Sequence, residues 1–412
     1  MNGFRIFSIA RNDGLWKIAE SMMNRRAAIA LALGTGVGAI QGCRREEKLS
    51  ATKEDQKMAP PKQEREGQNL VPVKVDPSLE IRTIAGLRPF RSPGFLVKRE
   101  ERNGKILIHN YGHGGGGMTL SWGSSELAAR LAGDISGKEC AVVGGGVMGL
   151  STARLLQLRG AKVTLYSKAL PPHTTSNVAG AQWWPFSVFD DHRRTPEFGA
   201  QYVEAANISY RYFQGLVGPK WGVRWLPNYY LSDDAPVNGW IAGPGGVLHD
   251  LQVGFHDFGP GEHVFPAAYA RRFHTMMIEP ATYLAELLGE IQEAGGRIVV
   301  RDFAAGEEVL GLPEGIIFNC TGLGAGALFG DTELVPIKGQ LSFLIPQPAV
   351  DYNLLTSLTY MFPRSDGILL GGSYEKGKWD TVPDEAIRRQ ILGSHQRLFD
   401  GMREIQRSLR PS

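Results

Sequence analysis

A glycine pattern near residue 145 constrains the fold more than any other feature of the chain. An apolar run at 140–143 leads into Gly144-x-Gly146-x-x-Gly149, and an apolar-periodic helical stretch begins at Leu150. The first glycine permits a tight turn, the second lets the backbone approach a pyrophosphate, and the third lets helix and strand pack closely. The order of strand, turn and helix therefore predicts a dinucleotide site with its phosphates at the helix N-terminus.

A second predicted strand at 162–167 completes a β-α-β unit and indicates an α/β, Rossmann-like fold. Such folds usually carry an acidic residue after this strand to hold a ribose hydroxyl. This chain has Lys168 there, which leaves Ser167 as the candidate for that contact. A basic residue also suits a phosphorylated ribose, as in an NADP enzyme.

Another glycine-rich turn precedes the fingerprint. A predicted strand at 105–108 is followed by four consecutive glycines, Gly114–Gly117, and then by a helical pattern at 126–131. Backbone amides in such a turn bind an anion or a polarised ring, so two turns of this kind suggest one large dinucleotide held from two sides. His109 and His113 are read as structural imidazoles rather than metal ligands, because no third ligand accompanies them at metal spacing.

Charge and cysteine content exclude several classes. The 412-residue chain has a formal net charge of +3, and no basic stripe with interleaved aromatics points to nucleic acid. Two of its three cysteines, Cys140 and Cys320, lie in apolar strand contexts, so no disulfide framework is implied.

The N-terminus reads as a signal segment at 1–43. Asn24-Arg25-Arg26 precedes an apolar run at 27–40, which resembles a twin-arginine export signal, and Ile40-Gln-Gly-Cys43 resembles a lipobox. We expect an extracytoplasmic protein, periplasmic or anchored to the membrane through a lipid on Cys43; a hydrophobic N-terminus without a targeting role is the alternative. Residues 44–76 are rich in Lys, Glu, Gln and Pro and are expected to form a disordered linker.

Seven further segments carry a family resemblance that covers residues 79–412. They are Gly86-Leu-Arg-Pro-Phe-Arg91, His109-Asn-Tyr-Gly-His-Gly-Gly115, and the stretches at 174–185, 273–284, 319–328, 336–340 and 370–372. These segments closely resemble the D-amino-acid oxidase family of flavoproteins. In that family the fingerprint opens the chain and the first two segments close it, whereas here both precede the fingerprint. The order predicts a circular permutation, with 79–133 as the moved segment and the old ends joined across 133–139.

The resemblance implies two domains. A Rossmann-like FAD-binding domain is expected at 77–190 and 278–335, and a mixed, β-sheet-rich substrate domain at 191–277 and 336–412. It implies FAD as the cofactor and Arg88 as the carboxylate-binding arginine, since a guanidinium binds a carboxylate through two parallel hydrogen bonds. Gly115 matches the glycine whose carbonyl faces the substrate amine. The family's active-site tyrosine aligns with Ala270, so the adjacent Tyr269 is the candidate.

The expected FAD contacts come from the two glycine-rich turns and four other segments. They are Gly114, Gly115, Gly116, Gly117, Met118, Thr119, Gly144, Gly146, Val147, Met148, Gly149, Ser167, Thr174, Thr175, Ser176, Gly180, Ala181, Gln182, Phe303, Thr321 and Gly322. The expected activity is oxidation of D-amino acids to 2-oxo acids, with oxygen as the acceptor. Alternatives are a dehydrogenase of glycine or N-substituted amino acids that reduces a quinone, and a non-catalytic flavin-binding envelope protein.

Overall fold

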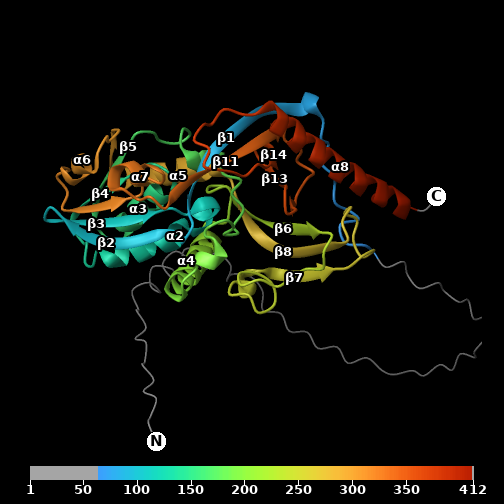
Figure 1. Cartoon of the computed structure of the whole chain (residues 1–412), viewed down its shortest axis with the longest axis horizontal. Coiled ribbons are helices and arrows are strands. Elements are labelled where there is room, and N and C mark those ends of the chain that lie inside the picture. Colours follow the sequence, from blue (N-terminus) through green and yellow to red (C-terminus); the bar gives the residue numbers. More distant parts are fainter. Residues whose placement is uncertain (1–63, 411–412) are drawn as a thin grey trace, which may run out of the picture. The chain divides into compact units, whose positions relative to one another are not determined.

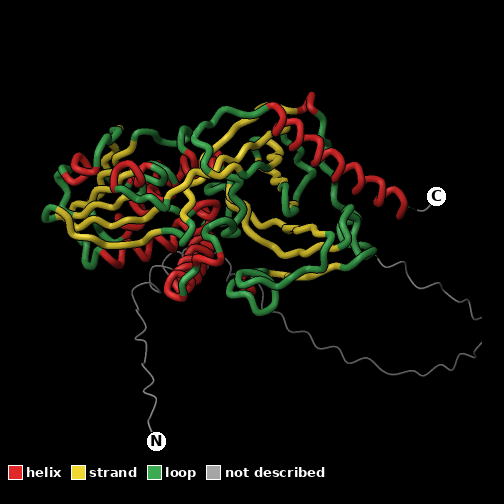
Figure 2. The backbone as a smooth tube through the Cα atoms, viewed as in Figure 1, coloured by secondary structure: helices red, strands yellow, loops and turns green. Residues whose placement is uncertain are grey.

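The computed structural model describes residues 64–410, which form two β-sheets with flanking helices (Figures 1 and 2). The expected signal at 1–43, Cys43 and the linker residues up to 63 lie outside the described residues. No helix within 64–410 combines the length and apolar character needed to cross a bilayer.

The first sheet has six strands and carries the fingerprint. Its spatial order is β2 (Leu96–Arg102), β3 (Lys105–Tyr111), β10 (Ile316–Asn319), β4 (Glu139–Val143), β5 (Lys162–Ser167) and β9 (Arg297–Val300). All neighbours pair in parallel except the β2–β3 hairpin. Parallel strands are normally covered on both faces, and β4 shows this coverage. Cys140 and Val142 join one buried cluster, while Ala141 and Val143 join another.

Helices cover both faces of this sheet. The larger cluster contains residues of α2 (Gly117–Leu131), α3 (Val147–Leu158) and α5 (Pro280–Glu293), together with α4 (Pro196–Gly215). The smaller cluster includes Val309 of α6 (Gly306–Leu310), and Phe329 of α7 (Gly324–Phe329) packs against it. The helix α4 therefore packs with the fingerprint sheet, although it lies in the range expected for the substrate domain.

The second sheet has nine strands and is mixed. Its order is β1 (Glu80–Arg91), β11 (Leu334–Leu344), β14 (Gly367–Gly371), β13 (Tyr360–Arg364), β12 (Asn353–Leu355), β6 (Val223–Ser232), β8 (Tyr269–Ile278) and β7 (Val253–Phe258), with β15 (Glu375–Lys376) pairing β11. The strand β1 was expected in the FAD-binding domain, but it pairs with β11 from Glu80 to Arg91. The segment 79–133 therefore supplies strands to both sheets.

The long helix α8 (Glu385–Leu409) packs on the nine-stranded sheet (Figure 1). Asp384 caps it by accepting hydrogen bonds from the amides of Ala386 and Ile387. Its buried residues, among them Phe399 and Met402, share a cluster with the sheet residues Met361 and Leu370.

The expectation of a disordered linker through residue 76 is wrong for the described residues 64–76, which we call the strap. Val73 is fully buried and Val75 is 7% exposed, and both pack in the cluster beneath α8. Gln406 of α8 donates to the carbonyls of Gly67, Gln68 and Leu70. A composition with few apolar residues predicted disorder, but the two valines pack against a helix that is distant in the sequence.

Candidate active site

A large cavity is lined by residues from both sheets. Its volume is about 1440 Å³, above the roughly 300–1,000 Å³ of common small-molecule sites. The fingerprint turn after β4 forms part of its wall, and β1, β11 and β13 of the other sheet form another part. The cavity therefore has room for a large cofactor and a second, smaller ligand.

The fingerprint turn is packed as closely as the glycine pattern predicts. Gly144 has a φ of +121°, and a Cβ there would lie 2.3 Å from the carbonyl oxygen of Cys320. A Cβ on Gly149 would lie 1.7 Å from the carbonyl oxygen of Gly144. Gly144, Gly146, Val147 and Met148 line the cavity, so the N-terminus of α3 faces it. Gly149 does not line the cavity; it is the residue at which helix and strand meet.

The second glycine-rich turn forms the short helix η2 (Gly114–Gly116) and leads into α2. Gly114 has a φ of +55°, and a Cβ on it would lie 2.2 Å from the carbonyl oxygen of Ser187. The amide of Gly115 donates to that same oxygen at 2.9 Å. Gly114, Gly115, Gly117, Met118 and Thr119 line the cavity. Gly116 does not, because its α-carbon faces Val188.

All the other expected FAD contacts line the cavity. They are Ser167, Thr174, Thr175, Ser176, Gly180, Ala181, Gln182, Phe303, Thr321 and Gly322. Four of these hydroxyls are already engaged. Ser176 accepts from the amide of Val147 at 2.9 Å, and Ser167 donates to the carbonyl of Ala169 at 2.7 Å. Thr174 and Thr321 donate to the side-chain oxygens of Asn177 and Asn319. Ser167 thus keeps only acceptor capacity toward a ribose.

The structure adds a carboxylate at the same edge of the sheet. Asp302 lines the cavity two residues after β9, which pairs in parallel with β5. Because adjacent parallel strands end at the same edge, Asp302 lies on the side where Lys168 replaces the usual acid. Sequence reasoning missed Asp302 because it searched only after β5.

Two helix N-termini, a backbone-lined wall and a neighbouring carboxylate suit a dinucleotide. A pyrophosphate is stabilised by helix N-termini, and bare glycines allow the backbone to approach it. The described residues therefore fit FAD, and the two turns would hold its phosphates and its ring.

Arg88 enters the cavity from β1. It donates from Nη2 to the hydroxyl of Tyr360 at 3.2 Å. The neighbouring Arg91 forms an ion pair with Asp331 at 2.8 Å, whereas no described Asp or Glu forms one with Arg88. A Cβ on Gly339 would lie 3.0 Å from Nη2 of Arg88, so the glycine leaves space beside the guanidinium. The charge of Arg88 is therefore available to an anionic ligand.

The tyrosine at the site is not the one expected. Tyr269 does not line the cavity, whereas Tyr360 does. Met277, at the opposite end of β8, bridges to the cavity residue Gln182. Tyr269 lies eight residues earlier, or roughly 26 Å from Met277 along an extended strand.

A sequence signal for Tyr360 did exist. Gly371 lies opposite Tyr360 in the β13–β14 pair, and a Cβ on it would lie 2.2 Å from the ring. Paired glycines within a strand commonly mark a close approach, and here Gly371 and Gly372 accommodate the tyrosine ring.

The two histidines of the second turn have separate environments. His113 stacks on Phe95 with ring centroids 4.6 Å apart, and burial lowers its pKa to about 3, so the imidazole is neutral. The Nδ1 of His109 lies 3.0 Å from the Nδ2 of Asn319. Burial lowers the pKa of His109, while Glu100 acts in the opposite direction.

The protein has a Rossmann-like sheet, a mixed second sheet and a cavity lined by both. The cavity combines a site for a dinucleotide with an available arginine, as in a flavin-dependent oxidoreductase. The sequence matches the family described as FAD dependent oxidoreductase over residues 139–411. That match spans more than half of the chain, and the protein belongs to this family. FAD is accordingly its cofactor.

Several characterised proteins are similar in sequence. The D-amino-acid oxidase of Rubrobacter xylanophilus is 33% identical over 258 residues, which cover 61% of this chain and 74% of that protein. The human D-aspartate oxidase is 29% identical over 263 residues, covering 61% and 73%. The crystal structure of glycine oxidase from Geobacillus kaustophilus shares the fold, with a TM-score of 0.50 and 16% identity over 65% of this chain and 80% of that one.

Proposed function

We propose that the protein oxidises D-amino acids, with FAD, to 2-oxo acids. The observation that carries this proposal is Arg88, a cation without a described carboxylate partner, placed in the cavity that the glycine turns line. The similarity to D-amino-acid oxidases supports the substrate class. Bound FAD supplies the two-electron acceptor for the hydrogen on the substrate α-carbon.

Arg88 and Tyr360 would bind the substrate carboxylate together. The planar guanidinium offers parallel N–H donors that match two carboxylate oxygens. Because the Tyr360 oxygen accepts from Arg88, its own O–H remains free to donate to the carboxylate. Holding the carboxylate at two points orients the α-carbon, and Gly115 on the wall of the same cavity offers a carbonyl for the amine.

The overall reaction balances with oxygen as the acceptor. The amino acid loses a hydride and a proton to give an imino acid, oxygen gains both to give hydrogen peroxide, and water releases ammonia from the imino acid. D-Amino acids should therefore yield 2-oxo acid, ammonia and peroxide in equal amounts, and L-amino acids should yield none. Turnover with a quinone but without peroxide would identify a dehydrogenase instead. A flavin that no amino acid reduces would leave a non-catalytic flavin protein.

We also propose that the chain is a circular permutant. The family match begins at Glu139, yet the segment before it supplies Arg88 and the second glycine turn. The turn between α2 and β4 contains Gly133 and Gly137, each with a φ of +71° and open space around it, as an added joint would permit. The end of α8 lies beside the strap, where Gln406 contacts Gly67–Leu70.

That contact suggests a test by relinking. A variant that begins at Gly137, ends at Gly133 and joins Arg410 to Glu64 through a short flexible linker should fold, bind FAD and unfold at a similar temperature. If this variant does not fold while the natural order does, the permutation proposal fails.

We further propose export and anchoring through Cys43, supported by the arginine pair, apolar run and lipobox-like end of residues 24–43. Cys43→Ser should move the protein from the membrane fraction to the soluble fraction. An unchanged distribution contradicts the anchor.

A further inference from the structure

A loop that lines the cavity near Arg88 exposes large apolar side chains. This segment, residues 372–384, is called the rim loop below. Its Tyr374 and Trp379 line the cavity, and they are 54% and 63% exposed. Leu358, from the turn between β12 and β13, also lines the cavity and is 80% exposed. Exposed apolar side chains gathered at the mouth of a site commonly mark a binding surface.

Buried polar groups on β11 fix the rim loop in place. Lys338, only 4% exposed, donates from Nζ to the Asp380 carboxylate at 2.5 Å and to the Val382 carbonyl at 2.6 Å. Gln340 is fully buried and exchanges hydrogen bonds with the backbone of Asp384. The loop is therefore held at several points along its length.

The strand β11 contacts both Arg88 and the rim loop that carries Trp379. Arg88 pairs with Ile337 across β1 and β11. Lys338 is the next residue, and it binds Asp380, which directly follows Trp379. The segments that carry the aromatic side chain and the carboxylate-binding cation thus share one rigid support, as a preorganised binding site requires.

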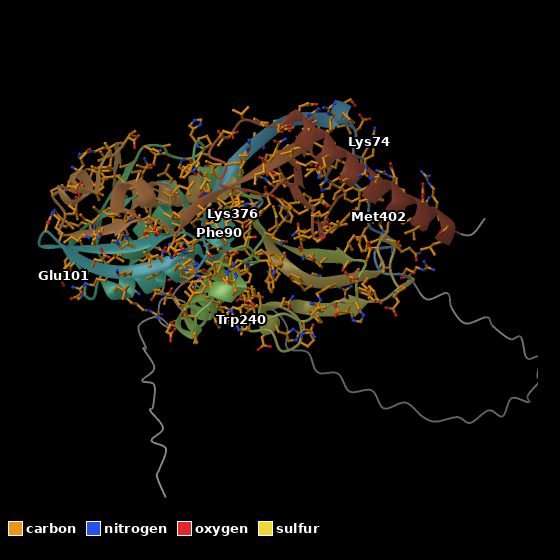
Figure 3. The ribbon with its side chains drawn as sticks, in the orientation of Figure 1. Lys74, Phe90, Glu101, Trp240, Lys376 and Met402 are labelled. Atoms are coloured by element: carbon orange, nitrogen blue, oxygen red, sulfur yellow. The ribbon has the colours of Figure 1, made fainter. Side chains whose placement is uncertain are left out.

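The charges around the mouth disfavour a second carboxylate on the substrate. The other described basic side chains that line the cavity, apart from the neutral His113, are Lys168, His173 and Arg301, all on loops after β5 and β9 of the fingerprint sheet. Lys376 of the rim loop is directed elsewhere: its Nζ lies 3.7 Å from Asp190 and 5.3 Å from the ring of Phe90. Figure 3 labels Lys376 and Phe90. Burial and the nearby Asp190 raise the pKa of Tyr374, which keeps that hydroxyl neutral.

We propose that Trp379, with Tyr374 and Leu358, is the surface that selects a neutral, bulky apolar side chain on a monocarboxylic substrate. This inference rests on the proposed function, because it takes Arg88 as the group that binds the α-carboxylate. Covering exposed aromatic surface with an apolar side chain removes both from water, and an aromatic substrate adds a ring–ring contact.

The test uses the FAD-loaded full-length protein and compares D-phenylalanine, D-alanine and D-aspartate. Trp379→Ala should lower kcat/KM for D-phenylalanine by about 10- to 100-fold, while the value for D-alanine changes by less than about threefold. Trp379→Phe should restore most of the loss. Val382→Ala is the matched control, since Val382 is 70% exposed on the same loop but does not line the cavity.

A second readout separates this inference from the proposed reaction. Phenylacetate and acetate are titrated into the oxidised protein, and binding is followed by the change in flavin absorption. Phenylacetate should bind more tightly than acetate, and Trp379→Ala should remove most of that difference.

The outcomes are distinguishable. Equal losses for D-alanine and D-phenylalanine, or a wild-type preference for D-aspartate, overturn the inference and leave D-amino-acid oxidation standing. If no amino acid reduces the flavin but phenylacetate still binds more tightly than acetate through Trp379, the proposed binding role of Trp379 is supported and the proposed reaction is overturned.

Discussion

The guanidinium of Arg88 on β1 donates to the hydroxyl of Tyr360 on β13 at 3.2 Å, across two intervening strands. Because the Tyr360 oxygen accepts this hydrogen bond, its O–H remains free to donate to another acceptor. We expect that acceptor to be the carboxylate of the substrate.

Tyr360→Phe should therefore weaken carboxylate binding without reducing FAD content. A hydrogen bond to a charged group contributes about 1.5–3 kcal/mol, which corresponds to roughly a 10- to 100-fold rise in Kd. The Kd is measured by titrating phenylacetate into the oxidised protein and following the flavin absorption. Tyr269→Phe is the control, because Tyr269 does not line the cavity. An equal effect of both changes would contradict the assignment of Tyr360, rather than Tyr269, as the tyrosine that binds the carboxylate.

Gly149→Ala should impair the cofactor site through packing. The new methyl group would lie 1.7 Å from the carbonyl oxygen of Gly144, so α3 must move away from β4. Overpacking of this kind costs about 1–3 kcal/mol, and displacement of the α3 N-terminus should lower FAD affinity. Thermal unfolding and flavin content measure both effects.

The control for that change is Gly289→Ala in α5, where no atom lies within 4 Å of the added group. It should raise helix stability by up to about 1 kcal/mol. If Gly149→Ala behaves like this control, the close packing of the fingerprint turn is refuted.

Val73→Ala tests whether the strap belongs to the folded core. Val73 is fully buried, whereas Val71 in the same segment is 44% exposed. Removing two buried methyl groups should lower the free energy of unfolding by about 1–3 kcal/mol, while Val71→Ala should change it by less than about 0.5 kcal/mol. Equal effects in denaturant titrations would favour the disordered linker.

Asp366 should make stability depend on pH. Burial acts to raise its pKa, but the ion pairs with Arg364 and Arg82 outweigh burial, and the pKa lies below the ordinary value. A carboxyl group with a lowered folded-state pKa stabilises the fold above its unfolded pKa of about 3.9. That contribution is lost as the pH falls through the lower folded-state value.

Asp366→Asn should therefore cost about 1–2 kcal/mol at pH 7, and the difference from wild type should shrink toward pH 3. The exposed Asp351 supplies the control in Asp351→Asn. A cost that stays constant from pH 7 to pH 3 would show that Asp366 acts through packing rather than charge.

Local patterns were sufficient to predict the β-α-β unit of the fingerprint. The turn at Gly144, the helix after it and the second strand depend on residues that are close in sequence, and the structure has all three. The family resemblance of Gly86–Arg91 predicted Arg88 as the carboxylate-binding arginine, and Arg88 lines the cavity.

The features that were missed depend on contacts between distant segments. Tyr360 reaches Arg88 only through the registers of β1, β11, β14 and β13, which no single segment specifies. The strap is ordered because Val73 and Val75 pack under α8, which lies more than 300 residues away in the sequence. Arg403 of α8, for example, donates to the carbonyl of Val73, 330 residues earlier. Composition alone carries no information about such a partner.

We expect the cavity to hold FAD and Arg88 to bind the carboxylate of a D-amino acid beside it. The most direct measurement is anaerobic mixing of the FAD-loaded protein and its Arg88→Met variant with D- and L-phenylalanine, followed by flavin absorption. The D-enantiomer should bleach the wild-type flavin and the L-enantiomer should not. Arg88→Met should retain FAD but require a substrate concentration higher by roughly 30- to several thousand-fold, since an unpaired carboxylate costs about 2–5 kcal/mol. Bleaching of the variant at wild-type concentrations of D-phenylalanine would contradict the account.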